Sequence, residues 1–186
     1  MPQSAHCYLE KKMRKLRYRV VTSLDGYIAA PNGAVDWIPI DPDVDFGAIY
    51  RQFDTALIGR RTFETMVKAR NTSLPGIRVF VFSRILSQAD YPGITIVKDN
   101  ALEVVTRLRA KAGKDIWLFG GGALFSSLAE LGVVDTVEVS VMPVLLGQGI
   151  PMIATAKRLE LELTGHKVYE KTGIVSLMYS VKNACR

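Results

Sequence analysis

The chain has 186 residues and a net charge of +6; 48% of its residues are hydrophobic and 23% are charged. This length fits one domain and this composition is typical of a soluble globular protein. No apolar run approaches the roughly 18 residues that a membrane span needs, and the N-terminal segment lacks the apolar core of a signal peptide. We therefore expect a cytoplasmic protein. The cysteines, Cys7 and Cys185, lie near opposite ends and predict neither a disulfide framework nor a metal site.

The positive charge is concentrated near the N-terminus. Six basic residues without an intervening acid are Lys11, Lys12, Arg14, Lys15, Arg17 and Arg19. Such a run can bind nucleic acid or a membrane surface, but it is more often a solvated terminus, and the run does not match a recognised nucleic-acid-binding motif. We expect residues 1–15 to form a flexible basic extension and residues 16–183 to form one domain, with neither nucleic acid nor membrane as a partner.

The apolar pattern alternates between strands and helices along the chain. Strands are predicted at 17–24, 55–59, 77–83, 94–97, 115–120 and 133–145. Helices are predicted at 44–53, 60–69, 101–113 and 123–131. Residues 160–170 and 174–182 form a final hairpin around Lys171-Thr172-Gly173. This order predicts a three-layer α/β domain, with a mixed, mostly parallel sheet, flanking helices and a C-terminal antiparallel hairpin.

Three consecutive glycines, Gly120, Gly121 and Gly122, follow a predicted strand and precede a helix. A dinucleotide-binding fingerprint requires glycine or alanine where this chain has Phe125, and the chain contains no P-loop motif. A strand, glycines and a helix start still present free N–H groups to an anion. Close packing of the strand against the helix is the alternative, and the glycines alone do not decide between the two.

Two other predicted strand ends carry residues that suit a phosphate. Gly59 is followed by Arg60, Arg61 and Thr62 at a helix start, and Ser83 with Arg84 follows the next strand. Arginines at a helix start oppose the helix dipole unless an anion lies there, and their planar groups bind phosphate with two bonds. Ligands of α/β sheets bind at strand ends. Three such ends together favour an extended, phosphate-rich ligand.

The segment after the first strand is a loop with several acids. Asp25-Gly26 predicts a hairpin turn, and further along lie Asp36, Asp41, Asp43 and Asp45. Such a loop could close over a substrate. Alternatively, Asp43 or Asp45 caps the helix that we expect to begin near residue 44.

The motifs SLDGYIA, LIGRRTFE, VFSR and LFGGGALF, in this order, resemble the dihydrofolate reductase-like superfamily over residues 17–182. Pro143, Gly147 and Gly149 are similar to a stretch in the reductase domain of riboflavin biosynthesis. The resemblance implies the three-layer fold of that superfamily and NADPH bound across the strand ends. It also implies a cis peptide between two of the glycines and, as is common in the family, a homodimer.

The resemblance also assigns roles to residues. The positions that match the NADPH site are Val21, Ile28, Ala29, Gly59, Arg60, Arg61, Thr62, Ser83, Arg84, Gly120, Gly121, Gly122, Ala123 and Leu124. Ser83 and Arg84 match the pair that holds the 2′-phosphate, which distinguishes NADPH from NADH. Asp45, with Asp43 as the alternative, matches the acid that binds substrate and assists its protonation.

We therefore predict a stand-alone NADPH-dependent reductase that transfers hydride to a pyrimidine- or pterin-like substrate, similar to 5-amino-6-(5-phosphoribosylamino)uracil reductase. Three alternatives stay open at this stage. They are a dihydrofolate reductase, a non-catalytic NADPH-binding protein, and a nucleic-acid-binding protein that uses residues 11–19.

Overall fold

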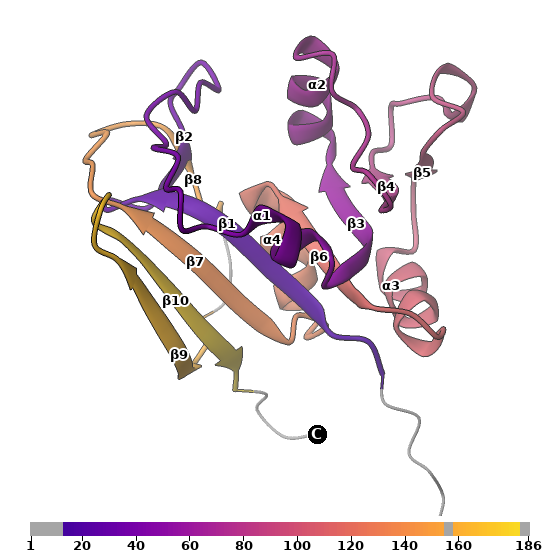
Figure 1. Ribbon diagram of the computed structural model, residues 1–186. Helices are drawn as coiled ribbons and strands as arrows, with labels where there is room; N and C mark the ends of the chain where they lie inside the picture. The colour runs from indigo at the N-terminus through magenta and orange to yellow at the C-terminus, as the bar shows by residue number, and fades with distance from the viewer. Residues whose placement is uncertain (1–12, 155–157, 183–186) are drawn as a thin grey trace, which may run out of the picture.

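The computed structural model describes residues 13–154 and 158–182. In this part of the chain, the central sheet has eight strands in the order β5-β4-β3-β6-β1-β7-β10-β9. The strands from β5 to β7 are parallel, and β10 runs antiparallel to both of its neighbours. Figure 1 shows this sheet, with the β9–β10 hairpin at one end and β4 and β5 at the other.

The observed elements follow the predicted order closely. The strands are β1 (Leu16–Ser23), β2 (Tyr27–Ala29), β3 (Phe53–Gly59), β4 (Arg78–Phe82), β5 (Thr95–Val97), β6 (Asp115–Gly120), β7 (Thr136–Met142), β8 (Ile150–Pro151), β9 (Leu161–Tyr169) and β10 (Ile174–Val181). The helices are α1 (Phe46–Tyr50), α2 (Arg60–Lys68), α3 (Ala101–Ala110) and α4 (Gly122–Glu130), with a 3-10 turn η1 (Gln88–Asp90). None of the described helices is long and apolar enough to cross a membrane.

Helices cover both faces of the parallel part of the sheet. On one face, α3 and α4 pack on β1, β3 and β6 around Leu57, Leu118 and Phe125. On the other, α1 and α2 pack on β3, β4 and β6 around Ile58, Phe63 and Trp117. The continuous apolar sequences of β3 and β4 are explained by this arrangement, because parallel strands buried on both faces show no polar alternation.

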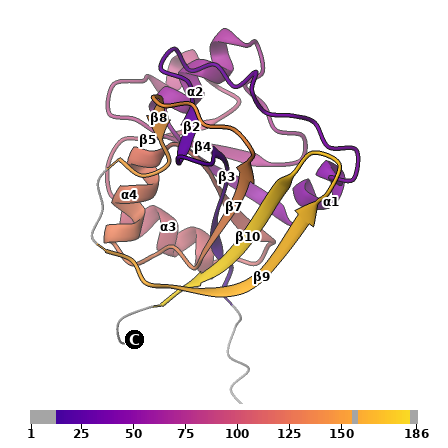
Figure 2. The same cartoon turned by 90° about the vertical axis from the view of Figure 1, so that its left-hand side faces the viewer.

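The end of the sheet formed by β10 and β9 has little helical cover. Figure 2 shows the hairpin in front of the molecule, with α3 and α4 to one side and α1 to the other. Most of β9 is exposed, while β10 is largely half-buried.

The predicted helix over 44–53 is much shorter in the structure. Helix α1 covers only Phe46–Tyr50, and Phe53, assigned to that helix from its spacing, begins β3 instead. There its side chain is 2% exposed and stacks on Trp117 with ring centroids 5.2 Å apart. Burial against Trp117 thus outweighs the local helical periodicity, which is a weak determinant beside tertiary packing.

Three of the six clustered basic residues lie in ion pairs within the fold. Residues 1–12, with Lys11 and Lys12, lie outside the described part. Arg14 is buried: its guanidinium contacts the Asp54 carboxylate and donates to Thr55 Oγ1 at 2.9 Å. Arg17 and Arg19 both donate to Glu138, at 2.6 and 2.8 Å. These three guanidinium groups form ion pairs within the protein, so they are not available to bind a polyanion such as nucleic acid.

Glu138 is the buried centre of this network, at 6% exposure. Burial alone would raise the pKa of its carboxyl group, but the hydrogen bonds and charges of Arg17 and Arg19 outweigh burial and hold this pKa below its usual range. A lowered pKa in the folded state means that the carboxylate stabilises the fold above its unfolded pKa of about 4.3. That contribution is lost as the pH falls through the lowered value.

We therefore predict that Glu138→Gln flattens the acid limb of the stability profile. In urea unfolding between pH 3 and 7, the variant should lose about 3 kcal/mol at pH 7, because a buried partner of two arginines is removed. The difference in unfolding free energy from the wild type should narrow as the pH falls below the unfolded pKa of about 4.3, because the wild-type carboxylate then progressively loses its stabilising contribution. Glu130→Gln, on an exposed position of α4, should follow the wild-type curve. A gap that stays constant over the whole pH range would contradict the assigned role.

Candidate active site

The triple glycine forms the junction between β6 and α4. Strand β6 ends at Gly120, the Gly120-Gly121 peptide is cis, and α4 begins at Gly122. The cis bond implied by the resemblance is therefore present. Gly120 has a φ of 153°, which side chains rarely tolerate. Gly121 caps α4 without any side-chain hydrogen bond, so the first N–H groups of this helix are not satisfied by a capping side chain.

A second helix start lies directly beside the first. Gly59 ends β3 and caps α2, again without a side-chain bond. A Cβ placed on Gly59 would lie 3.5 Å from both the Gly120 carbonyl oxygen and the Gly121 nitrogen. A Cβ on Gly121 would lie 3.1 Å from Thr62 Oγ1 and 3.9 Å from Ile28 Cδ1. Two helix N-termini, both without side-chain caps, thus converge at one edge of the sheet, where an anion is favoured.

Several other predicted cofactor residues join this cluster. Leu124 on α4 would lie 3.5 Å from a Cβ on Gly59, and Ala123 is exposed in the first turn of α4. Ala29 is buried on β2, and Val21 is half-buried on β1. Residues predicted from the motifs SLDGYIA, LIGRRTFE and LFGGGALF are therefore contributed by neighbouring elements.

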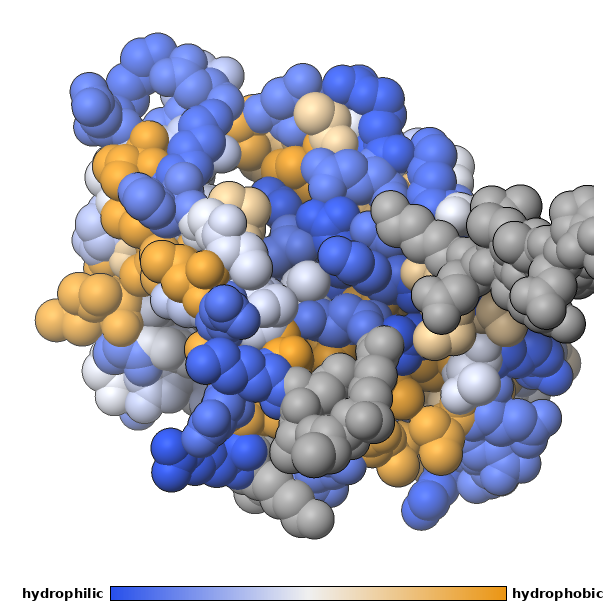
Figure 3. Space-filling model, turned by 90° about the horizontal axis from the view of Figure 1, so that it is seen from below, coloured by the Kyte–Doolittle hydropathy of each residue, from blue (hydrophilic) through white to orange (hydrophobic). Residues whose placement is uncertain are grey.

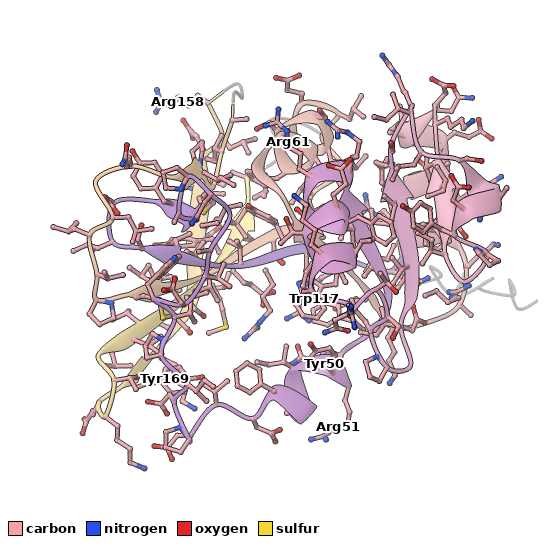
Figure 4. All side chains as sticks on the ribbon, turned by 90° about the horizontal axis from the view of Figure 1, so that it is seen from above. Tyr50, Arg51, Arg61, Trp117, Arg158 and Tyr169 are labelled. Carbon is pink, nitrogen blue, oxygen red and sulfur yellow. The ribbon has the colours of Figure 1, made fainter. Side chains whose placement is uncertain are left out.

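The two arginines of the α2 start differ in their surroundings. Arg60 donates to Glu64 Oε1 at 2.7 Å, one turn further along α2. The Arg61 guanidinium is exposed and, within the described chain, has no hydrogen bond or ion pair. Figure 4 shows it on the side of the molecule away from α1. Arg61 is consequently the better placed of the two to meet an anion without losing an existing partner.

Ser83 and Arg84 follow β4, the strand next to β3. Gly59 pairs with Phe82, so both strands end at the same edge of the sheet. The Ser83 hydroxyl accepts hydrogen bonds from the N–H groups of Ile85 and Leu86, at 3.3 and 3.1 Å. The Arg84 side chain is 87% exposed and lies 3.8 Å from Asp99. The Ser83 proton and the Arg84 guanidinium both remain able to donate to a ligand.

A segment for which the sequence analysis noted only the family similarity of Gly147 and Gly149 contacts both the turn after β1 and the glycine junction. We call residues 144–152 the strap, because they connect the turn after β1 to the start of α4. The Asp25 carboxylate accepts from the N–H groups of Leu146 and Gly147, the latter at 2.7 Å. These bonds, after the bond from the Ser23 hydroxyl, hold the pKa of Asp25 below its usual range. Asp25 is thus more than a turn former.

The far end of the strap lies against the glycine junction. Tyr18 Oη donates to the Met152 carbonyl at 3.0 Å. A Cβ on Gly122 would lie 2.7 Å from the Pro151 carbonyl oxygen and 2.8 Å from that of Met152. Real Cβ atoms essentially never approach so closely. Gly122 therefore permits close packing against the strap, while Gly120 and Gly121 lie beside the two helix starts.

The two predicted acids lie in the loop before α1, where Asp45 is the N-cap residue of the helix. Asp45 caps α1 by accepting from the Ala48 N–H at 2.7 Å, and its side chain is 66% exposed. Asp43 is 3.0 Å from Lys171 in the β9–β10 turn. Asp41 is the buried acid here: it accepts from the Thr172 hydroxyl at 2.6 Å, and this bond is the main cause of a pKa below its usual range. No three metal-ligating side chains lie together among the described residues.

Comparisons with known proteins agree with this architecture. A model of the RibD C-terminal domain matches residues 14–175. The uncharacterized protein YyaP of Bacillus subtilis (strain 168) is 34% identical over 181 residues, which covers 90% of this chain and 95% of YyaP.

Two solved structures extend the comparison to the fold. A protein of Shewanella sp. PV-4 named for riboflavin biosynthesis is 26% identical and has a TM-score of 0.77, covering 92% of this chain and 100% of that one. A dihydrofolate reductase of Enterococcus faecalis, complexed with NADP(H) and RAB-propyl, has a TM-score of 0.65 at 17% identity, covering 91% of this chain and 97% of that one. The predicted fold class, a dihydrofolate reductase-like three-layer fold, is confirmed.

Gly122→Ala should destabilise the protein, because its new Cβ would collide with backbone carbonyls that cannot move without displacing the strap. Overpacking of this kind costs about 1–3 kcal/mol, which urea unfolding can measure. Gly93→Ala is a matched control, since a Cβ there meets nothing within 4 Å, and it should change stability by less than about 0.5 kcal/mol. Equal stability of the two variants would show that the strap is not fixed against α4.

Proposed function

Since this chain belongs to the RibD C-terminal domain family, we propose that it is an NADPH-dependent reductase acting on a pyrimidine- or pterin-like substrate. The observation that supports this most directly is the convergence of two helix starts, α2 and α4, both without side-chain caps, beside the exposed Arg61. The Enterococcus faecalis dihydrofolate reductase, which shares the fold, carries NADP(H). When bound, NADPH supplies the hydride.

The cofactor groups can be assigned to residues by their chemistry. The N–H groups at the starts of α2 and α4 suit the pyrophosphate, since helix N-termini favour anions. Arg61 and Thr62 add a charged and a neutral donor to that side. Ser83 and Arg84, one strand further out, suit a 2′-phosphate. Val21, Ile28 and Ala29 provide an apolar wall for the nicotinamide ring.

Reduction of a C=N bond also consumes a proton. Asp45, with Asp43 as the alternative, is the candidate to bind the substrate or to supply that proton. Both carboxylates are more than half exposed, so they can exchange protons with water. A reductase of the riboflavin-biosynthesis type and a dihydrofolate reductase both fit these roles, and the substrate distinguishes them.

Titration with NADPH and NADH, followed by absorbance assays with pterins and aminopyrimidines, tests the proposed activity. NADPH should bind more tightly than NADH, and at least one compound should cause NADPH oxidation. NADPH binding without turnover of any compound would instead favour a non-catalytic NADPH-binding protein. Failure to bind either cofactor would refute the assignment of the glycine site. A cytoplasmic location, expected from the sequence, is part of the same proposal.

Arg84→Ala should weaken NADPH binding by about ten- to a hundredfold, because a hydrogen bond to a charged group contributes about 1.5–3 kcal/mol. NADH has no 2′-phosphate, so its dissociation constant should change by less than twofold. Arg107→Ala, an exposed arginine on α3, should leave both constants unchanged. Calorimetry gives all of these constants, and equal losses for the two cofactors would remove Arg84 from the 2′-phosphate site.

We further propose that the chain forms a homodimer through the uncovered end of its sheet. Strand register places the side chains of Val175, Leu177 and Tyr179 on β10 on the same face as Leu163 and Val168 on β9. Leu163 and Val168 are each 53% exposed. Figure 3 shows hydrophobic side chains gathered on the left, the side on which β9 and β10 lie in Figure 1. Exposed apolar patches of this kind mark protein interfaces.

Sedimentation equilibrium should therefore give twice the mass of one chain at micromolar concentration. Leu163→Lys should shift the equilibrium to monomer, because a lysine in an apolar interface must be desolvated. Leu102→Lys replaces an equally exposed leucine on α3, at 46% exposure, and should leave the dimer intact. A wild-type protein that is monomeric at all concentrations would contradict this assignment.

A further inference from the structure

A pair of serine hydroxyl groups continues the proposed site across the sheet. Val21 on β1 pairs with Ser140 on β7, and Ser140 pairs with Ser176 on β10. The two hydroxyl groups are hydrogen-bonded, with their Oγ atoms 2.8 Å apart. Paired residues on neighbouring strands share a face, so both serines lie on the face of Val21, a residue of the proposed nicotinamide wall. A substrate that receives the hydride there lies over Ser140 and Ser176.

Aromatic side chains border the same face of the sheet. Trp117 on β6 pairs with Arg17 on β1, and Arg17 lies on the same face of β1 as Val21, so Trp117 also lies on this face. Tyr50 on α1 contacts the Trp117 ring edge-on at 5.5 Å. Tyr169 on β9 lies opposite Ile174 on β10. Figure 4 shows Tyr50, Trp117 and Tyr169 on the side of the molecule that carries α1. Flat rings are favoured beside such side chains, because aromatic groups stack or meet edge to face.

The cations around this face are already engaged by groups of the protein itself. Arg17 and Arg19 are bound to Glu138, Lys171 lies 3.0 Å from Asp43, and Arg51 lies 3.5 Å from Asp45. The ammonium group of Lys167 lies over the Tyr169 ring at 4.3 Å. Among the described residues around the face, five cations are thus balanced by five carboxylates: Asp41, Asp43, Asp45, Asp115 and Glu138.

This balance opposes the binding of a phosphate. Phosphate sites use guanidinium or ammonium groups that are free to donate, often two at once. Here a dianion would have to displace a carboxylate from Arg19 or Lys171, or draw Lys167 away from the Tyr169 ring and from the charge of Asp41. A neutral ring requires no such exchange, and its amide or imino edge can hydrogen-bond to the Ser140–Ser176 pair.

We infer that the substrate of this reductase is a neutral, planar heterocycle without a phosphate group, seated on Ser140 and Ser176. The inference rests on the proposed function. In the reaction, the carbon of a C=N bond receives hydride from NADPH, the nitrogen takes a proton, and NADP⁺ is released. The serines bind the ring edge and orient it, and they take no part in the proton transfer.

A matched pair of compounds tests the inference: 5-amino-6-(5-phosphoribosylamino)uracil, and the same compound after removal of its phosphate. 7,8-Dihydropterin is the third compound. Their binding to the NADP⁺-saturated protein is measured by calorimetry, and turnover is measured by NADPH absorbance. A phosphate-free compound should bind at least tenfold more tightly than the phosphorylated one and should be turned over.

Equal or tighter binding of the phosphorylated compound would overturn the inference. So would the failure of all three compounds to bind while NADPH binds, and that outcome would leave the cofactor assignment standing. Failure of NADPH itself to bind would refute the proposed function and, with it, the inference.

Ser176→Ala tests whether the serine pair binds the substrate ring, independently of whether the substrate carries a phosphate. It should raise the KM of the preferred compound about fivefold, because one neutral hydrogen bond is lost, while kcat and the NADPH dissociation constant change less than twofold. Ser73→Ala, at an exposed position between α2 and β4, should change none of these values. An unchanged KM in the Ser176 variant, or an equal loss of NADPH binding, would show that the hydroxyl group only supports the fold.

Discussion

The close approach of Gly122 to the carbonyl oxygens of Pro151 and Met152 is the constraint on which the site depends. Because no side chain separates them, the strap lies directly on the start of α4. The Met152 carbonyl in turn accepts a hydrogen bond from the Tyr18 hydroxyl, and the Asp25 carboxylate accepts a hydrogen bond from Gly147 N–H in the other half of the strap. Gly149 adds a second contact of this kind, since a Cβ there would lie 2.4 Å from the Ala29 carbonyl oxygen. The small β2–β8 sheet, and with it Ile28, is thereby placed against the glycine junction.

The sheet divides into two electrostatic regions. At the ends of β3 and β6, helix-start N–H groups without side-chain caps and the exposed Arg61, which has no ion pair among the described residues, leave positive potential. Along β1 and β7, by contrast, the arginines are bound to Glu138 and Asp115. In the function proposed above, the first region binds the phosphates of the dinucleotide and the second binds the uncharged ring. A reductase needs both kinds of surface side by side, because hydride transfer requires the two rings to meet while the phosphates are held elsewhere.

For several residues, the tertiary contacts show a role that differs from the one expected from the sequence, or that the sequence did not indicate. The run of basic residues looked like a solvated terminus, yet Arg14, Arg17 and Arg19 are engaged by Asp54 and Glu138, which are distant in sequence. Asp45 caps α1, as one of the two readings of the acidic loop predicted. Asp41 was given no role, although it is the acid of that loop that is buried and anchors the loop to Thr172.

The order of strands and helices could be predicted from the sequence alone, because the burial of apolar side chains imposes a local periodicity. The sequence also showed which strand ends carry glycine, arginine and serine, and these motifs were sufficient to predict the fold class and a candidate cofactor site. Which charges remain free could not be predicted in this way, because ion pairs in the folded protein join residues up to about 120 positions apart. Only the tertiary structure decided the length of α1 and the role of Asp25, because both follow from contacts with strands and loops far along the chain.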